Sequence, residues 1–382
     1  MQFSTSSVRS TKKEYKLKQY LDLVRDVYEN GYNHTDRTGV GRRSIFGAQL
    51  RFKMSDGFPL LTARKIFTKS IVGETLWFLS GSSDVRELVE KYGVHIWDNW
   101  AVKEEDIKAF SEKHFPDNLM VAKAFSNQLM NTHLGDIGRI YGRVWRHAPV
   151  STSNPLRPII PYHEMDPARM EQYQAAYKAL VESPDGEGFG TTHSFEAFAR
   201  EMNSSEVDQM AILIKNLKEH PYSSRHVVTS WLPDSVPSEN CSPQENVLNS
   251  CGALAACHVL QQYMVMPPKE EGGKMRLSLQ MYQRSADLIL GSPSNIAQYA
   301  MLLHMVAQVV DMEPYEFIYS LGDVHLYLNH LDQIEELLSR ETPPLPTIKL
   351  NPEISNLFQF KPEDIEFLDY NPGPTMKFDI AV

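Results

Sequence analysis

The hydrophobic positions along the chain recur with a helical period in several stretches. Between residues 16 and 28 apolar side chains return every three or four positions, which predicts an amphipathic helix that ends at Gly31. Four further stretches show helical spacing: 65–79, 167–180, 207–217 and 296–310. Gly81 ends the first of these four, and Ser294 or Asn295 is placed at the N-cap of the last.

At 50–54 and 275–281 apolar and polar side chains alternate, which is the period of a strand with one solvated face. In chain order, we expect strands at 50–54, at 223–231, directly after Cys257 within 254–263, at 275–281, ending in 322–330, and in the tail at 378–382. A helix that runs to about Ser339 follows the fifth of these strands. Strands and helices do not alternate regularly, so we expect an α+β fold with a large mixed sheet packed by helices, and not a doubly wound sheet.

Three polar excursions interrupt this pattern, at about 101–133, 148–204 and 233–250. The first lacks firm periodicity, and the second is rich in proline and then in glycine around its predicted helix. Loops of this length inside a compact domain are functional or form separate subdomains. We therefore predict one catalytic domain over 14–382 that carries three insertions, preceded by a polar tail over 1–13.

The stretch 254–263 places Cys257 in a run of small apolar residues beside a predicted strand. A free cysteine in such a setting is usually an inert core thiol. A reactive thiolate needs a neighbouring cation or hydrogen-bond donor. His258 is a poor candidate, because successive side chains of a strand point to opposite faces.

Composition narrows the possible classes of protein. The 382 residues are 42% hydrophobic and 23% charged, and no apolar run approaches the about 18 residues of a membrane span. The polar start has no apolar signal-peptide core, and three cysteines without metal-ligand spacing indicate a reducing cytoplasm. A net charge of −10 argues against general nucleic-acid binding.

Three other segments carry candidate chemistry. Glu74 lies within the apolar helix predicted over 65–79, where burial would raise its pKa toward that of a general acid or base. Arg37 lies in a glycine-containing loop over 33–41 and could meet an anion. The tryptophans of 94–100 could form core or a wall for a flat ligand.

Taken together, these segments resemble the thymidylate synthase family, which includes the pyrimidine nucleotide hydroxymethylases. The resemblance covers nearly the whole chain apart from the excursions. Its motifs occur in the family's order: Asp36-Arg37-Thr38-Gly39, Glu74 before Leu76-Trp77-Phe78, Ile96-Trp97-Asp98, Tyr141-Gly142, Ser224-Arg225, Cys257-His258, Gln283-Arg284-Ser285 with Asp287, Asn295-Ile296-Ala297, and Gly322-Asp323 with His325 and Tyr327.

The resemblance implies a role for each of these residues. The catalytic set is Cys257, which adds to C6 of a pyrimidine nucleotide, Glu74, which moves protons through water, Tyr141 and Asn295. The nucleotide is held by Arg37, Arg225, Arg284 and Ser285 at the phosphate, by His325 and Tyr327 at the deoxyribose hydroxyl, and by Asn295 at the base. The one-carbon donor, 5,10-methylenetetrahydrofolate, contacts Trp97, Asp287, Leu254, Gly291 and Val382. The resemblance implies no metal. It implies a homodimer in which Arg225 reaches the partner's site.

The amide of Asn295 indicates the base. Uracil presents an N3 donor beside an O4 acceptor, and one amide complements both, whereas family members that use cytosine tend to carry a carboxyl here. The resemblance therefore implies dUMP and not dCMP as substrate.

Five positions depart from the family's pattern around the ligands. They are Ala256, His226, Val144, Leu232 and Ser294, where the synthases usually carry proline, arginine, glutamine, asparagine and phenylalanine. Small or polar replacements beside the base suit a positioned water, and water gives a hydroxymethyl product. We therefore expect a deoxyuridylate hydroxymethylase, whose product is typical of viral DNA modification.

Three alternatives remain open. A thymidylate synthase is favoured by Trp97, Leu254 and the terminal Val382, which match the synthase residues that cover the methylene. An idle relative that binds nucleotide or RNA is disfavoured by the intact set of Cys257, Glu74 and Asn295 and by the negative net charge. A cysteine hydrolase is the third alternative.

Overall fold

The computed structural model describes residues 17–35, 39–149, 167–182, 194–195 and 206–380. Its centre is a six-stranded sheet of order β1-β2-β8-β7-β6-β5. The strands are β1 (Tyr32–His34), β2 (Arg42–Lys53), β5 (Val227–Thr229), β6 (His258–Met266), β7 (Arg276–Asp287) and β8 (Glu313–Tyr327). β7 and β8 are parallel and the other neighbours are antiparallel. The predicted α+β fold with a large mixed sheet is therefore confirmed.

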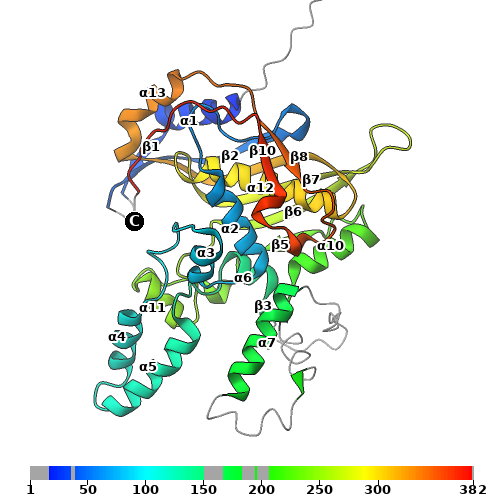
Figure 1. Ribbon diagram of the computed structural model, residues 1–382. Coiled ribbons are helices and arrows are strands. Elements are labelled where there is room, and N and C mark those ends of the chain that lie inside the picture. The colour runs from blue at the N-terminus through cyan, green and yellow to red at the C-terminus, as the bar shows by residue number, and fades with distance from the viewer. Residues whose placement is uncertain (1–16, 36–38, 150–166, 183–193, 196–205, 381–382) are drawn as a thin grey trace, which may run out of the picture.

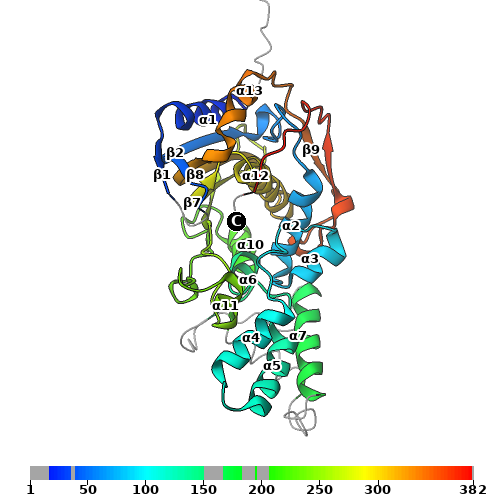
Figure 2. The same cartoon turned by 90° about the vertical axis from the view of Figure 1, so that its left-hand side faces the viewer.

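One long helix, α12 (Gly291–Val309), is the hydrophobic centre of the molecule. It is buried nearly all round, as expected for a helix without a hydrophilic face. It packs on β7 and β8 and on α2 (Thr68–Ser80), while α1 (Lys18–Asn30) packs on β2 and β8. In Figure 2 α12 and α2 lie to one side of the sheet.

The remaining helices and short strands surround this core. The helices are α3 (Val85–Tyr92), α4 (Glu104–His114), α5 (Leu119–His133), α6 (Tyr141–Arg146), α7 (Pro167–Val181), α10 (Gln209–Glu219), α11 (Pro243–Leu248) and α13 (Ile334–Ser339). Short 3₁₀ helices lie at Met54–Asp56, Pro233–Ser235, Leu328–Gln333, Leu357–Gln359 and Pro362–Asp364. Two-stranded ladders pair β3 (Ala148–Pro149) with β4 (Glu206–Val207) and β9 (Thr347–Leu350) with β10 (Ile365–Leu368).

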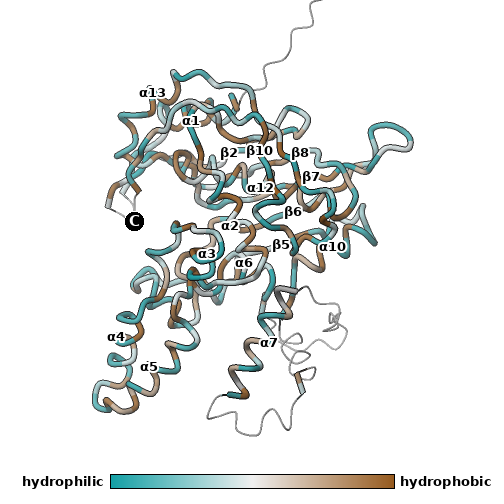
Figure 3. The backbone as a smooth tube through the Cα atoms, viewed as in Figure 1, coloured by the Kyte–Doolittle hydropathy of each residue, from teal (hydrophilic) through white to brown (hydrophobic). Residues whose placement is uncertain are grey.

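Helices α4 and α5 form a hairpin that extends away from the sheet, and α7 extends in the same general direction (Figure 1). Helix α11, from the excursion at 233–250, packs on both α4 and α5. The described parts of the excursions thus contain ordered helices. On the other side of the molecule, the 267–275 connection between β6 and β7 is hydrophilic and protrudes (Figure 3).

Most predicted elements appear, with shifted ends. α1, α2, α7 and α10 match predicted helices, and Gly81 adopts the left-handed conformation, with φ of 78°, that ends α2. The helix predicted over 296–310 begins earlier, at Gly291, so Ser294 and Asn295 lie inside the helix and the N-cap prediction was wrong. Asp287 instead accepts the backbone N–H groups of Ile289 and Leu290, just before the helix.

Two other expectations need correction. The stretch 101–133 is not an irregular excursion, because it folds as α4 and α5. The tail is not a strand in its described part, since residues 369–380 carry no regular structure. Cys257 lies directly before β6, as the sequence indicated. Among the described residues, no helix is long and apolar enough to span a membrane.

Candidate active site

The thiol of Cys257 lies where β6 begins, beside the side chain of Arg284 on β7. Antiparallel pairing brings the two together, because His258 faces Gln283 and the Arg284 N–H donates to the Cys257 carbonyl at 2.9 Å. Nη2 of Arg284 lies 3.8 Å from Sγ of Cys257. The guanidinium also donates to the carbonyls of Ala255 at 2.7 Å and Ala256 at 3.0 Å, which fixes its position.

Burial and charge act on this thiol in opposite directions. Burial raises the pKa of Cys257, and the Arg284 guanidinium and the Tyr141 hydroxyl each lower it by less. The net effect is a raised pKa, so the protein alone holds a mainly neutral thiol near pH 7. Arg284 supplies the cation that a thiolate needs, but its charge alone does not offset the effect of burial on the pKa. The thiolate therefore requires an additional stabilising interaction.

Tyr141 joins the thiol to the aromatic layer of the site. Its hydroxyl accepts the backbone N–H of Cys257 at 3.0 Å, and its ring lies 5.9 Å from that of Trp97, measured between centroids. Tyr141 begins α6 with a φ of 41°, in the left-handed region that a bulky residue seldom adopts. This unusual backbone directs the phenol toward the nucleophile.

Glu74 lies on α2 with both carboxylate oxygens engaged. Trp97 donates from Nε1 to Oε1 at 2.7 Å, and Gln298 of α12 donates from Nε2 to Oε2 at 3.0 Å. Burial raises the pKa of Glu74 to about 7, and the two hydrogen bonds act in the opposite direction. A carboxyl group with this pKa can both take and give a proton near neutral pH.

His258 does not serve the thiol. It is buried, and its ring lies against those of Tyr141 and Tyr299 at centroid distances of 5.0 and 5.2 Å. Burial lowers the pKa of His258 to about 4, against a weaker effect of its hydrogen bond with Asn295. The ring is therefore neutral, and its hydrogen bond helps to hold Asn295 in position.

The amide of Asn295 is oriented by a buried chain of hydrogen bonds. Gln283 donates from Nε2 to Oδ1 of Asn295 at 3.2 Å, and the Tyr319 hydroxyl donates to Oε1 of Gln283 at 2.7 Å. Because the Asn295 oxygen already accepts a hydrogen bond, rotation of its amide is opposed. A ligand here meets a donor and an acceptor in a fixed order.

His325 and Tyr327 lie at the end of β8, next to the end of β7. Asp287 and His325 are paired in register, and the ring centroids of His325 and Tyr327 lie 5.2 Å apart. Nδ1 of His325 lies 3.6 Å from a carboxylate oxygen of Asp323, which also forms a 2.8 Å ion pair with Arg42. Ser285, with its side chain half-buried, faces Asp323 across the same strands.

The other predicted arginines are placed differently. Arg225 lies just before β5 at the far edge of the sheet, with an exposed side chain that has no partner among the described residues. Arg37 and Val382 lie outside the described residues. The structure therefore brings together Cys257, Tyr141, Glu74, Trp97, Arg284 and Asn295 and keeps Arg225 apart from them.

Comparison with known proteins decides the family. The family model described as thymidylate synthase matches residues 18–382. The chain belongs to the thymidylate synthase family. A relative named thymidylate synthase, from Leuconostoc mesenteroides subsp. mesenteroides, is 36% identical over 384 residues, which cover 95% of this chain and 98% of the relative. Thymidylate synthase family enzymes transfer one carbon from methylenetetrahydrofolate to dUMP.

The described residues fit the folate that the thymidylate synthase family uses. A Cβ added at Gly291 would meet only Oδ1 of Asn295 at 3.5 Å and Cβ of Asp287 at 3.8 Å, so the glycine leaves room beside both. Asp287 is half-buried, and its Oδ2 accepts one long bond of 3.3 Å, from the Leu290 N–H. That oxygen can accept N–H donors of a pterin.

The departures from the thymidylate synthase pattern lie mostly in the scaffold. His226 is 1% exposed, and its Nε2 is 3.1 Å from the carbonyl oxygen of His220, so it does not face a phosphate. Val144 and Ala256 are buried, and Leu232 flanks a 3₁₀ turn. Ser294 is half-buried in the first turn of α12.

Sequence reasoning missed two supporting residues. Gln298, which bonds Glu74, follows Asn295 by three positions on α12, so helical spacing from Asn295 could have indicated it. Arg42, which pairs with Asp323, could not be recognised from the sequence, because nothing there distinguishes it from a solvated cation at the start of a strand. Among the described residues, no cluster of side chains could hold a metal ion.

Proposed function

We propose that this enzyme is a thymidylate synthase that converts dUMP to dTMP. One observation carries the proposal: this chain is similar to a protein named thymidylate synthase. The similarity covers 95% of this chain and 98% of that relative. Our sequence-based preference for a hydroxymethyl product is not supported by these comparisons. The departures that suggested it include His226, which is turned into the scaffold.

The first chemical task is to turn C5 of uracil into a carbon nucleophile. The Cys257 thiolate adds to C6, forming an S–C6 bond while the C5=C6 electron pair moves to C5 and O4. Arg284 lies 3.8 Å from the sulfur, so its charge favours the thiolate over the thiol. Tyr141 fixes the backbone of Cys257 through the 3.0 Å hydrogen bond.

The second task is to move protons at O4 and C5. Glu74 does this through water, because its carboxyl group has a pKa of about 7 and two fixed donors hold its orientation. Asn295 selects uracil by pairing its amide with N3–H and O4, an order that the Gln283 hydrogen bond maintains. His325 and Tyr327 bind the deoxyribose hydroxyl.

Methylenetetrahydrofolate supplies the one-carbon unit and, for a methyl product, the hydride. Asp287 and Gly291 would hold it at the start of α12, and Trp97, Leu254 and Val382 would cover the reacting carbon. Trp97 is 8% exposed and packs on Tyr141, which leaves an apolar wall where water would have to enter. Breaking of the S–C6 bond then releases the product and restores the Cys257 thiol.

A homodimer completes the phosphate site in this proposal. Arg284 and Ser285 contribute from one subunit, together with Arg37, and Arg225 from its partner, because guanidinium groups suit a phosphate dianion. Two observations support a partner on the sheet: Arg225 is exposed without a described partner, and four strands carry exposed apolar side chains. These are Phe46, Val227, Met264 and Tyr282, exposed by 88%, 40%, 61% and 38%.

The proposal is tested by adding dUMP and methylenetetrahydrofolate and following the absorbance of dihydrofolate. We expect dihydrofolate to form at the rate of dUMP loss. Cys257→Ser should abolish it, whereas the matched control Cys251→Ser should not, because Cys251 is not part of the site. Loss of dUMP without dihydrofolate would contradict a synthase, and no loss of dUMP would favour an idle relative.

A further inference from the structure

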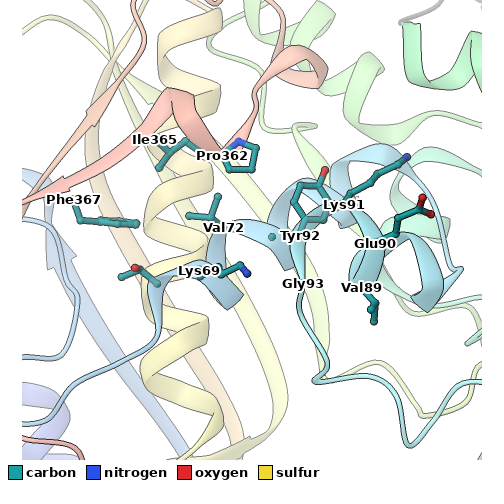
Figure 4. A pocket seen from close by; sticks show the side chains of 12 residues that line it. Lys69, Val72, Val89, Glu90, Lys91, Tyr92, Gly93, Pro362, Ile365 and Phe367 are labelled. Carbon is teal, nitrogen blue, oxygen red and sulfur yellow. The ribbon is translucent and has the colours of Figure 1, made fainter.

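A cavity lies across α2 from the active site. Its volume is about 580 Å³. The side chains that line it come from α2, α3 and the β10 region (Figure 4). At about 100° per residue, the lining positions Lys69, Val72 and Gly73 share one face of α2, and Glu74 points from the opposite face. The volume falls within the range of small-molecule sites.

Two glycines give this cavity its shape. A Cβ at Gly73 would lie 2.8 Å from Cβ of Tyr92, so α2 and the end of α3 approach closely only because the side chain is absent. A Cβ at Gly93 would lie 2.8 Å from Nζ of Lys69, so the ammonium rests directly over this glycine.

The walls combine apolar and polar side chains, and the polar ones are Thr68, Lys69, Glu90 and Lys91. Val72, Tyr92 and Phe367 offer flat or branched apolar surface, and Lys69 has no ion-pair partner among the described residues. Lys91, at the rim, is neutralised by Glu87 at 2.9 Å. In Figure 4 Lys69 is drawn beside Val72, and Glu90 lies beyond Tyr92.

We propose that this cavity binds an aromatic monocarboxylate. The ring lies against Val72, Tyr92 and Phe367, which removes apolar surface from water. The carboxylate pairs with the ammonium of Lys69, which forms no ion pair within the described part of the chain. This site is separate from the dUMP and folate sites, and its existence does not depend on the proposed function.

The cavity is connected to the catalytic carboxyl group through two short segments. Gly73 directly precedes Glu74 on α2. Tyr92 and Gly93 end α3, and the chain then reaches Trp97, whose Nε1 donates to Glu74. A ligand between the end of α3 and α2 therefore contacts both elements that set the Glu74–Trp97 distance, and we infer that its binding changes the pH profile of turnover.

Isothermal titration calorimetry with 1-naphthoate tests the site, with 1-naphthamide as the uncharged matched probe. We expect saturable binding of 1-naphthoate to the full chain that is unchanged by saturating dUMP. Lys69→Met should weaken it about tenfold, and Lys69→Arg should retain it. The control Lys123→Met removes a cation from α5, outside the cavity, and should have no effect.

Three results would overturn the site: no heat of binding, equal affinity of 1-naphthoate for the wild type and Lys69→Met, or displacement by dUMP. Equal affinity of naphthoate and naphthamide would also refute the role of Lys69. The connection to Glu74 is tested by the pH profile of dUMP turnover with and without 1-naphthoate. Binding without a shift in that profile would refute the connection and leave the site standing.

Discussion

Nη2 of Arg284 lies 3.8 Å from Sγ of Cys257 and at the same time donates to the carbonyl of Ala255 at 2.7 Å. The cation is thus held by the backbone of the segment that carries the thiol, and not by the thiol itself. It remains in place when the sulfur is neutral and is ready to stabilise the thiolate.

This arrangement predicts how the thiol responds to loss of the cation. Arg284→Met should raise the pKa of Cys257 further, because Arg284 opposes the larger effect of burial. We expect alkylation by iodoacetamide at pH 7 to slow roughly tenfold and its pH profile to move to higher pH. Arg276→Met, on the same strand, is the control, and an unchanged profile for Arg284→Met would contradict the role of Arg284.

The Glu74 site predicts a titration near neutral pH. Because the pKa of Glu74 is about 7, the pH profile of turnover should have a limb, a range of steep change in rate, near pH 7. Glu74→Gln should remove this limb and reduce kcat about 100-fold or more. Trp97→Phe removes a hydrogen bond that lowers the Glu74 pKa, so the limb should move to higher pH. The matched variant Trp100→Phe should leave it in place. A limb that persists in Glu74→Gln would assign it to another group.

The same pKa predicts a change in stability with pH. Because the folded-state pKa is raised from 4.5 to about 7, the folded state favours the neutral acid, and this advantage is lost as pH rises through 7. Glu74→Gln should therefore increase the free energy of unfolding more at pH 8 than at pH 4. The difference is at most about 3 kcal/mol, measured by urea titration at both pH values. An equal change at both would show that burial does not shift the pKa.

Several features of this site were visible in the sequence, and others depended on long-range pairing. Glu74 was predicted because a carboxylate in an apolar helix is unusual, and Gly81 marked the end of that helix. The contact of Cys257 with Arg284 joins positions brought together by the register of β6 and β7, which periodicity does not reveal.

The helices of the first excursion were missed for a physical reason. On α5 the large apolar residues Leu119 and Met120 are 65% and 79% exposed, whereas Ala122 and Ser126 are buried. Burial of small residues under exposed large ones gives no clear hydrophobic period. The start of α12 was misplaced because Ser294 and Asn295, which resemble a capping signal, lie inside the helix, and Asp287 accepts the N–H groups of Ile289 and Leu290 just before it.

The proposed dimer predicts complementation between two inactive variants. Cys257→Ser lacks the nucleophile, and Arg225→Met lacks the arginine that a partner would receive. Mixed after denaturation and refolding, they should regain about a quarter of wild-type activity, because half the dimers are mixed and each has one intact site. Refolding of each variant alone is the control. Mixtures that stay inactive would show that Arg225 does not act across subunits.

The central claim is that the carbon added to C5 of dUMP leaves as a methyl group. The most direct measurement is the mass of the nucleotide formed from dUMP and methylenetetrahydrofolate. The proposal predicts a gain of CH2 together with an equal amount of dihydrofolate. A gain of CH2O together with tetrahydrofolate would contradict it and identify a hydroxymethylase.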